Sequence, residues 1–95
     1  MEKSLVLRYN KTVKVDLVFS NECEITSIVL SGDFFAYPED TIERLEETLR
    51  NCDSVECVEN AFRGIKEAII LGVDVVDLKK KIVELLRECK KAKTT

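Results

Sequence analysis

The chain has 95 residues, a length typical of one small domain. Apolar residues make up 45 % and charged residues 35 %, which is ordinary for a globular protein and excludes a disordered one. The net charge of −3 argues against nucleic-acid binding. No apolar run reaches the roughly 20 residues of a membrane span. Because Met1-Glu2-Lys3 leads directly into a predicted strand, without a signal sequence, we expect a cytoplasmic protein.

The first third of the chain alternates between apolar and polar residues, which is the period of half-buried strands. We predict strands from Ser4 to Tyr9, from Thr12 to Phe19 and from Glu24 to Leu30. The polar segments between them, Asn10-Lys11 and Ser20-Asn21-Glu22, are typical of turns. Strands joined in sequence by short turns predict a three-stranded antiparallel meander, one face of which must be covered.

The rest of the chain has the 3.6-residue period of helices. We predict a first helix from about Pro38 to Arg50, because proline suits the first position of a helix. A last helix begins at Asp74, with Asp77 three residues later, a spacing typical of a capped helix start. Its apolar stripe is Leu78, Ile82, Leu85 and Cys89.

Between these two helices, the sequence predicts a third helix from Asp53 toward Gly72. Asp53-Ser54-Val55-Glu56 has the spacing of a capping box. The apolar stripe that follows consists of Val55, Val58, Phe62, Ile65 and Ile69. Because Gly64 lies within this stripe, a break into two shorter helices near Arg63 is an open alternative.

These elements predict a single α+β domain over residues 1–95. Its sheet half spans residues 1–35, and its helical half, residues 36–95, packs on one face of the sheet. The candidate core residues are Leu7, Val15, Leu17, Ile28, Leu30, Leu45, Leu49, Val58, Phe62, Ile65, Leu78, Ile82 and Leu85.

The chain contains four cysteines, Cys23, Cys52, Cys57 and Cys89, and no histidine. A zinc site would need all four thiolates, and the close Cys-x-x-Cys pairs usual in such sites are missing. We therefore expect no bound metal and, in a cytoplasmic protein, reduced and unpaired thiols. Because Cys52 and Cys57 flank a predicted helix start, a disulfide between them is the alternative.

One segment has the features of a binding surface: Gly32-Asp33-Phe34-Phe35, followed by Tyr37-Pro38. Glycine at a strand end can take a positive φ, and the next aspartate can accept hydrogen bonds from backbone N–H groups. Three aromatic residues within four positions are more than one tight turn easily buries. We expect at least one of them to face a partner or ligand, the alternative being that Phe34 and Phe35 cover the core.

The order of elements around this segment resembles a known family. It comprises the strands Val13–Phe19 and Ile25–Leu30, the Gly-Asp-Phe-Phe turn, Pro38 and the helix Ile42–Leu49. This order is similar to that of the C-terminal accessory domain of lipoate–protein ligases, in the form found as a separate small subunit. The resemblance implies a heterodimer with a catalytic subunit, in which this chain enables ATP-dependent activation of lipoate to lipoyl-AMP for protein lipoylation.

The same resemblance implies how the work is divided between the subunits. ATP, Mg²⁺ and lipoate are expected on the catalytic subunit, with no cofactor bound by this chain and no catalytic residue in it. Lipoyl-carrier domains are expected as indirect partners. We assign partner binding to the aromatic segment, with the residues Gly32, Asp33, Phe34, Phe35, Tyr37 and Pro38. The sequence leaves open which face of the chain docks.

Two other functions fit parts of the pattern. An iron–sulfur assembly scaffold or a sulfur-acceptor protein resembles this strand–turn–helix order, but it needs a thiolate near the Gly-Asp turn. Here Phe34, Phe35 and Ala36 occupy that position. An unrelated small interaction module is the other alternative. Independent catalysis is not expected, since histidine, a Gly-x-Ser-x-Gly motif and a phosphate-binding glycine loop are all missing.

Overall fold

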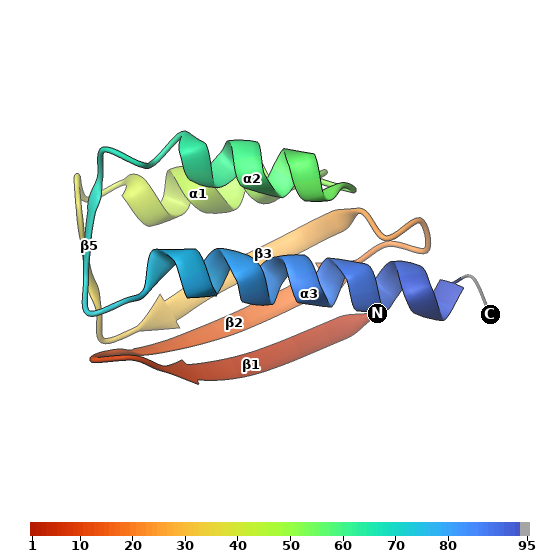
Figure 1. Ribbon diagram of the computed structural model, residues 1–95, viewed down its shortest axis with the longest axis horizontal. Coiled ribbons are helices and arrows are strands. Elements are labelled where there is room, and N and C mark those ends of the chain that lie inside the picture. The colour runs from red at the N-terminus through yellow and green to blue at the C-terminus, as the bar shows by residue number, and fades with distance from the viewer. Residues whose placement is uncertain (94–95) are drawn as a thin grey trace.

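The computed structural model describes residues 1–93. Along the chain these form a mixture of strands and helices (Figure 1). The elements are β1 (Glu2–Arg8), β2 (Thr12–Phe19), β3 (Ile25–Gly32), β4 (Phe35–Tyr37), α1 (Thr41–Leu49), α2 (Val55–Arg63), β5 (Ile69–Leu71) and α3 (Val75–Lys93).

The first three strands form the predicted antiparallel sheet, in the order β1-β2-β3. Val15 at the centre of β2 lies opposite Leu5 on one side and Leu30 on the other. The helices cover one face of this sheet (Figure 1), and the apolar residues of β2 on that face are buried. The other face is open and includes the exposed side chains of Val6 and Val29. The α+β prediction, with its meander and its covered face, is confirmed.

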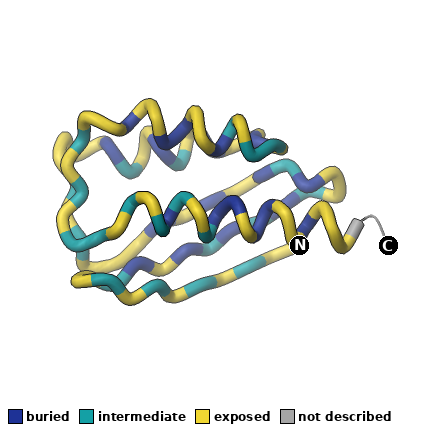
Figure 2. Tube along the Cα trace, in the orientation of Figure 1, coloured by how far each residue is buried: buried dark blue, intermediate teal, exposed yellow. Residues whose placement is uncertain are grey.

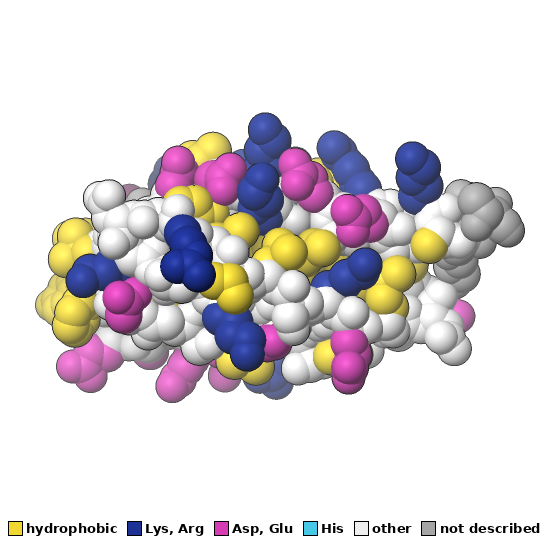
Figure 3. All heavy atoms as spheres, turned by 90° about the horizontal axis from the view of Figure 1, so that it is seen from below, with side chains coloured by type: hydrophobic (Ala, Val, Ile, Leu, Met, Phe, Trp, Pro, Cys, Tyr) yellow, Lys and Arg dark blue, Asp and Glu magenta, His cyan; other side chains and the backbone are white. Residues whose placement is uncertain are grey.

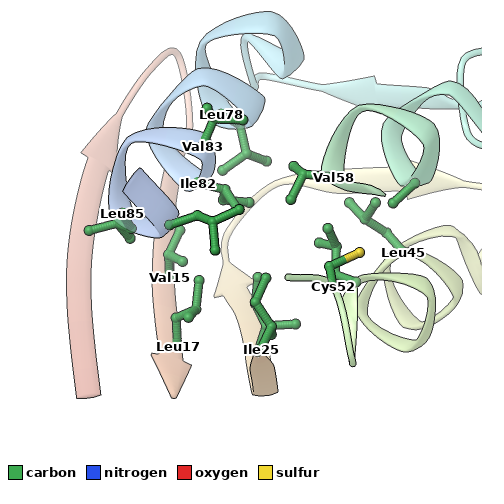
Figure 4. Packing of buried hydrophobic residues seen from close by; sticks show 14 of the residues in the cluster. Val15, Leu17, Ile25, Leu45, Cys52, Val58, Leu78, Ile82, Val83 and Leu85 are labelled. Carbon is green, nitrogen blue, oxygen red and sulfur yellow. The ribbon is translucent and has the colours of Figure 1, made fainter. Parts of the chain in front are cut away.

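The hydrophobic core lies between the sheet and the helices. In Figure 4, Val15 and Leu17 of β2 point toward side chains that come from the helices, among them Ile82 of α3. All predicted core residues are buried except Leu7, which is half-buried because β1 is an edge strand of the sheet. Burial along the trace is concentrated on the facing sides of β2, β3 and the helices (Figure 2).

Two predicted helix starts are wrong by a few residues. The first helix begins at Thr41 rather than Pro38. The carbonyl oxygen of Pro38 instead accepts hydrogen bonds from the Oγ1 and the backbone N–H of Thr41, at 2.7 and 3.0 Å, which closes a turn before the helix. At α2, Ser54 rather than Asp53 is the capping residue, because its Oγ accepts a hydrogen bond from the backbone N–H of Cys57 at 3.1 Å.

The predicted helix from Asp53 to Gly72 is also wrong in its second part. The helix ends at Arg63, so the alternative of a break near this residue is confirmed, but the segment after the break is not a second helix: after a series of turns the chain forms strand β5. Ile69, expected on a helical stripe, therefore lies in a strand. A short apolar run such as residues 68–71 is compatible with either state, and pairing with β4 decides in favour of a strand.

The cysteines are oxidised, so the prediction of reduced thiols is wrong. The alternative pairing of Cys52 with Cys57 is present, with Cα atoms 5.5 Å apart. An unpredicted second disulfide joins Cys23, in the β2–β3 turn, to Cys89 near the end of α3, with a Cα–Cα distance of 5.8 Å. These residues are 66 positions apart in the sequence, and they meet because α3 runs back along the sheet to that turn (Figure 1).

Candidate functional site

Strands β4 and β5 pair to form a separate two-stranded antiparallel ribbon. Phe35 lies opposite Leu71, and Tyr37 lies opposite Ile69. Because side chains alternate along a strand, these residues share one face, and they are 72, 61, 70 and 55 % exposed, in that order. We call these four side chains the ribbon face. The other side of the ribbon carries half-buried residues, with Ile70 packed against the core.

The ribbon face is a concentrated apolar surface at one end of the molecule. Hydrophobic side chains gather at the left end of the space-filling view (Figure 3), where Figure 1 places β5. The same residues, together with Ala36 and Glu39, line a shallow hollow of about 310 Å³. Single exposed apolar side chains are common in proteins, but a contiguous apolar patch typically marks an interaction site.

The end of β3 that leads into the ribbon is fixed by contacts with β2. Gly32 has φ = 152°, and a Cβ atom at this position would collide with the carbonyl oxygen of Thr12. Oδ1 of Asp33 accepts a hydrogen bond from the backbone N–H of Thr12 at 2.8 Å. The predicted glycine geometry and the aspartate–backbone bond are therefore both present. The donor comes from the start of β2 rather than from the turn itself.

The end of β5 is fixed by the turn that joins β1 to β2. The backbone N–H of Lys11 donates to the carbonyl oxygen of Gly72 at 2.9 Å. Gly72 has φ = 86°, and a Cβ atom there would collide with the side chain of Lys11. Next to this contact, the hydroxyl of Tyr9 donates to Oδ2 of Asp77 at 2.7 Å. The β1–β2 turn thus holds the exit from β5, and Thr12, the first residue of β2 after that turn, holds the entry to β4.

The tyrosine in this arrangement has a perturbed acidity. Burial raises the pKa of Tyr9 well above its usual range, and the hydrogen bond to Asp77 raises it further. The negative charges of Asp77 and Asp74 add to the effect, since both disfavour a second anion nearby. The protonated hydroxyl is therefore the form that the fold stabilises.

Replacing Tyr9 with phenylalanine is expected to reduce the loss of stability in alkali. Because the pKa is higher in the folded chain than the usual value of about 10, the contribution of Tyr9 is complete below about pH 10 and is lost as the pH rises further. Urea unfolding between about pH 8 and pH 11 should show the free energy of unfolding falling faster in the wild type than in Tyr9→Phe. Parallel curves would contradict this role of Tyr9.

The predicted site residues occupy different places in this arrangement. Phe35 and Tyr37 are exposed on the ribbon face, whereas Phe34 is half-buried against the core. Gly32 and Asp33 form the fixed elbow described above, and Pro38 lies in the turn that precedes α1, after a cis peptide bond.

Ile69 and Leu71 also belong to the ribbon face, although neither was predicted as a site residue. They lie more than thirty residues from β4 along the chain. The only local signal was an apolar run that ends in glycine, Ile69-Ile70-Leu71-Gly72.

Residues 1–93 contain no metal site, no free thiol and no membrane-spanning helix. No group of three or more Cys, Asp or Glu side chains in this part of the chain is arranged to hold a metal ion. Each of the four cysteines is in a disulfide, so none offers a thiolate. None of the helices in these residues has the length and apolar character needed to cross a membrane.

The chain is similar to known proteins of lipoylation. The structure matches, with a TM-score of 0.70 and 33 % identity, a chain from a structural analysis of an archaeal lipoylation system of Thermoplasma acidophilum, described as a bipartite lipoate protein ligase and its E2 lipoyl domain. The match covers 84 % of this chain and 92 % of that chain. The fold is therefore that of a component of a bipartite ligase.

A curated relative makes the similarity more specific. Lipoate-protein ligase A subunit 2 of Thermoplasma acidophilum is 49 % identical to this chain over 55 residues. The alignment spans 56 % of this chain and 57 % of the relative, so the chain matches a little over half of the relative's length. No protein-family model matches the chain. On these similarities, the chain belongs to the family of small subunits of bipartite lipoate–protein ligases.

Proposed function

We propose that this chain, as a single accessory domain, binds a catalytic lipoate ligase subunit and enables it to activate lipoate as lipoyl-AMP. The observation that carries the proposal is the ribbon face, on which four exposed apolar side chains project from two paired strands. Aromatic residues on a fixed backbone lose little entropy on docking and fill pockets on a partner well. Phe35 and Tyr37 are the proposed anchors, and Gly32 and Asp33 position them.

The proposed role is conformational rather than catalytic. A bound subunit shifts its partner toward an adenylation-competent state only if it binds that state more tightly than the others. ATP, Mg²⁺ and lipoate would then be held by the catalytic subunit, and lipoyl-carrier domains would be indirect partners. We place the assembly in the cytoplasm. The two disulfides of this chain are compatible with that location, because disulfides are also known from intracellular proteins of hyperthermophiles.

Separate assays of the two half-reactions test this role. Formation of lipoyl-AMP by the cognate catalytic subunit should depend on added chain, because that step needs ATP and the acid to be aligned. Transfer of the lipoyl group from preformed lipoyl-AMP to a carrier domain should depend on the chain much less, because that step no longer needs this alignment. Equal rates of lipoyl-AMP formation with and without the chain would contradict the proposal.

A further inference from the structure

A second hollow lies on a different side of the molecule from the ribbon face. It is a groove of about 330 Å³ between the end of α2 and the first turns of α3, beside β5. This volume is within the range of small-molecule sites, roughly 300 to 1,000 Å³. Ile70 of β5 lines the groove, whereas its neighbours Ile69 and Leu71 belong to the ribbon face. The two surfaces therefore use opposite sides of the same strand.

The groove combines an apolar floor with positive charges. Phe62 and Ile65 are buried side chains of the lining, and Ile70 and Val75 are half-buried. Val76, which is 73 % exposed, extends the apolar lining to the surface. A floor of this composition favours an alkyl chain over a free inorganic anion, which has no apolar part to bury.

The same groove is lined by three cationic side chains, Arg63, Lys66 and Lys79, and by one anionic side chain, Glu59. Arg63 is held at the end of α2 by a hydrogen bond from its Nη1 to Oδ1 of Asn60, at 2.7 Å. Lys66 and Lys79 form no ion pair with any residue from 1 to 93. In a chain of net charge −3, this local excess of positive charge beside an apolar floor favours an anion.

We propose that this groove binds straight-chain carboxylates of medium length, with the alkyl chain on the apolar floor and the carboxylate between Lys66 and Lys79. Binding in the groove leaves the ribbon face free, so the proposal is independent of docking to a catalytic subunit. Lipoate shares both features, since it is a carboxylate of medium length whose apolar chain ends in a dithiolane ring. If the docking proposal also holds, the groove gives the assembly a lipoate-binding surface outside the catalytic subunit, and this extension alone rests on the proposed function.

Titration of the isotopically labelled chain with octanoate, followed by amide chemical shifts, tests the proposal. Shifts should be saturable and concentrated at Ile70, Val75 and Lys79. Affinity should rise about tenfold with each two carbons from hexanoate to decanoate, since each buried methylene contributes about three- to fourfold. Acetate, which lacks the alkyl chain, and octanol, which lacks the carboxylate, should both bind more weakly than octanoate.

Charge reversal on α3 provides a matched pair of variants. Lys79→Glu should weaken octanoate binding about fivefold or more, because it replaces an attraction with a repulsion. Lys80→Glu makes the same change in net charge at the next residue, which does not line the groove, and should leave the affinity unchanged. The amide spectrum of each variant reports its fold. Absence of saturable binding, equal affinities of the two variants, or shifts confined to Phe35–Tyr37 would overturn the proposal.

Discussion

Replacing Phe35 and Tyr37 together with alanine is expected to weaken binding to the cognate catalytic subunit by at least about a hundredfold. Aromatic anchors at the centre of an interface typically contribute about 2 kcal/mol or more each, and 1.4 kcal/mol corresponds to a tenfold change in affinity. The two side chains are 72 and 70 % exposed, so their loss should leave the free energy of unfolding within about 1 kcal/mol of the wild type. Titration calorimetry measures the binding, and urea unfolding checks the fold.

The open face of the main sheet offers a matched control. Val6 and Val29 are also exposed apolar residues on strands, at 55 and 49 %. The double variant Val6→Ala/Val29→Ala should bind the catalytic subunit as the wild type does, because these side chains lie on the sheet and not on the ribbon. If both double variants bound equally well, the ribbon face would not be the interface. Loss of binding in the control alone would place the interface on the sheet.

Removing the disulfide between Cys23 and Cys89 is expected to lower the free energy of unfolding more than removing the disulfide between Cys52 and Cys57. In the loop-closure description, a cross-link restricts the unfolded chain more when it spans a longer segment. The 66-residue separation of this pair corresponds to about 4 kcal/mol, whereas the five-residue separation of Cys52 and Cys57 corresponds to about 2 kcal/mol. A loss of about 4 kcal/mol is a large part of the total stability of a small domain.

The comparison uses the double variants Cys23→Ala/Cys89→Ala and Cys52→Ala/Cys57→Ala, each unfolded in urea. The second variant is the control for the loss of buried sulfur, because both variants replace two cysteines that pack in or against the core. Cys23, Cys52 and Cys89 are buried, and Cys57 is half-buried. Mass spectrometry of unreduced peptides from the wild type should find the two pairs seen in the structure. A larger loss for the short pair, or equal losses, would contradict the dependence on loop length.

The main sheet could be predicted because its signals are local. Each strand alternates apolar and polar residues, and the turns between strands are short and polar, so neighbouring strands pair in sequence. The start of α3 could be predicted for the same reason. The carboxylate of Asp74 accepts a hydrogen bond from the backbone N–H of Asp77 at 3.0 Å, as the spacing indicates.

The features that escaped prediction depend on contacts between distant segments. β5 has only three residues, and its strand state exists because β4 pairs with it. The pairing of Cys23 with Cys89 likewise depends on the course of α3 along the sheet. For the candidate site, the aromatic half could be found from its clustering in the sequence. The aliphatic half, which β5 supplies, needed the tertiary structure.

The β1–β2 turn has a consequence for protein engineering. Exposed hairpin turns are ordinarily the positions at which tags and fused domains are inserted. Here an insertion between Asn10 and Lys11 would disturb the bond from Lys11 to Gly72 and, one residue further on, the bond from Thr12 to Asp33, and so both strands of the ribbon.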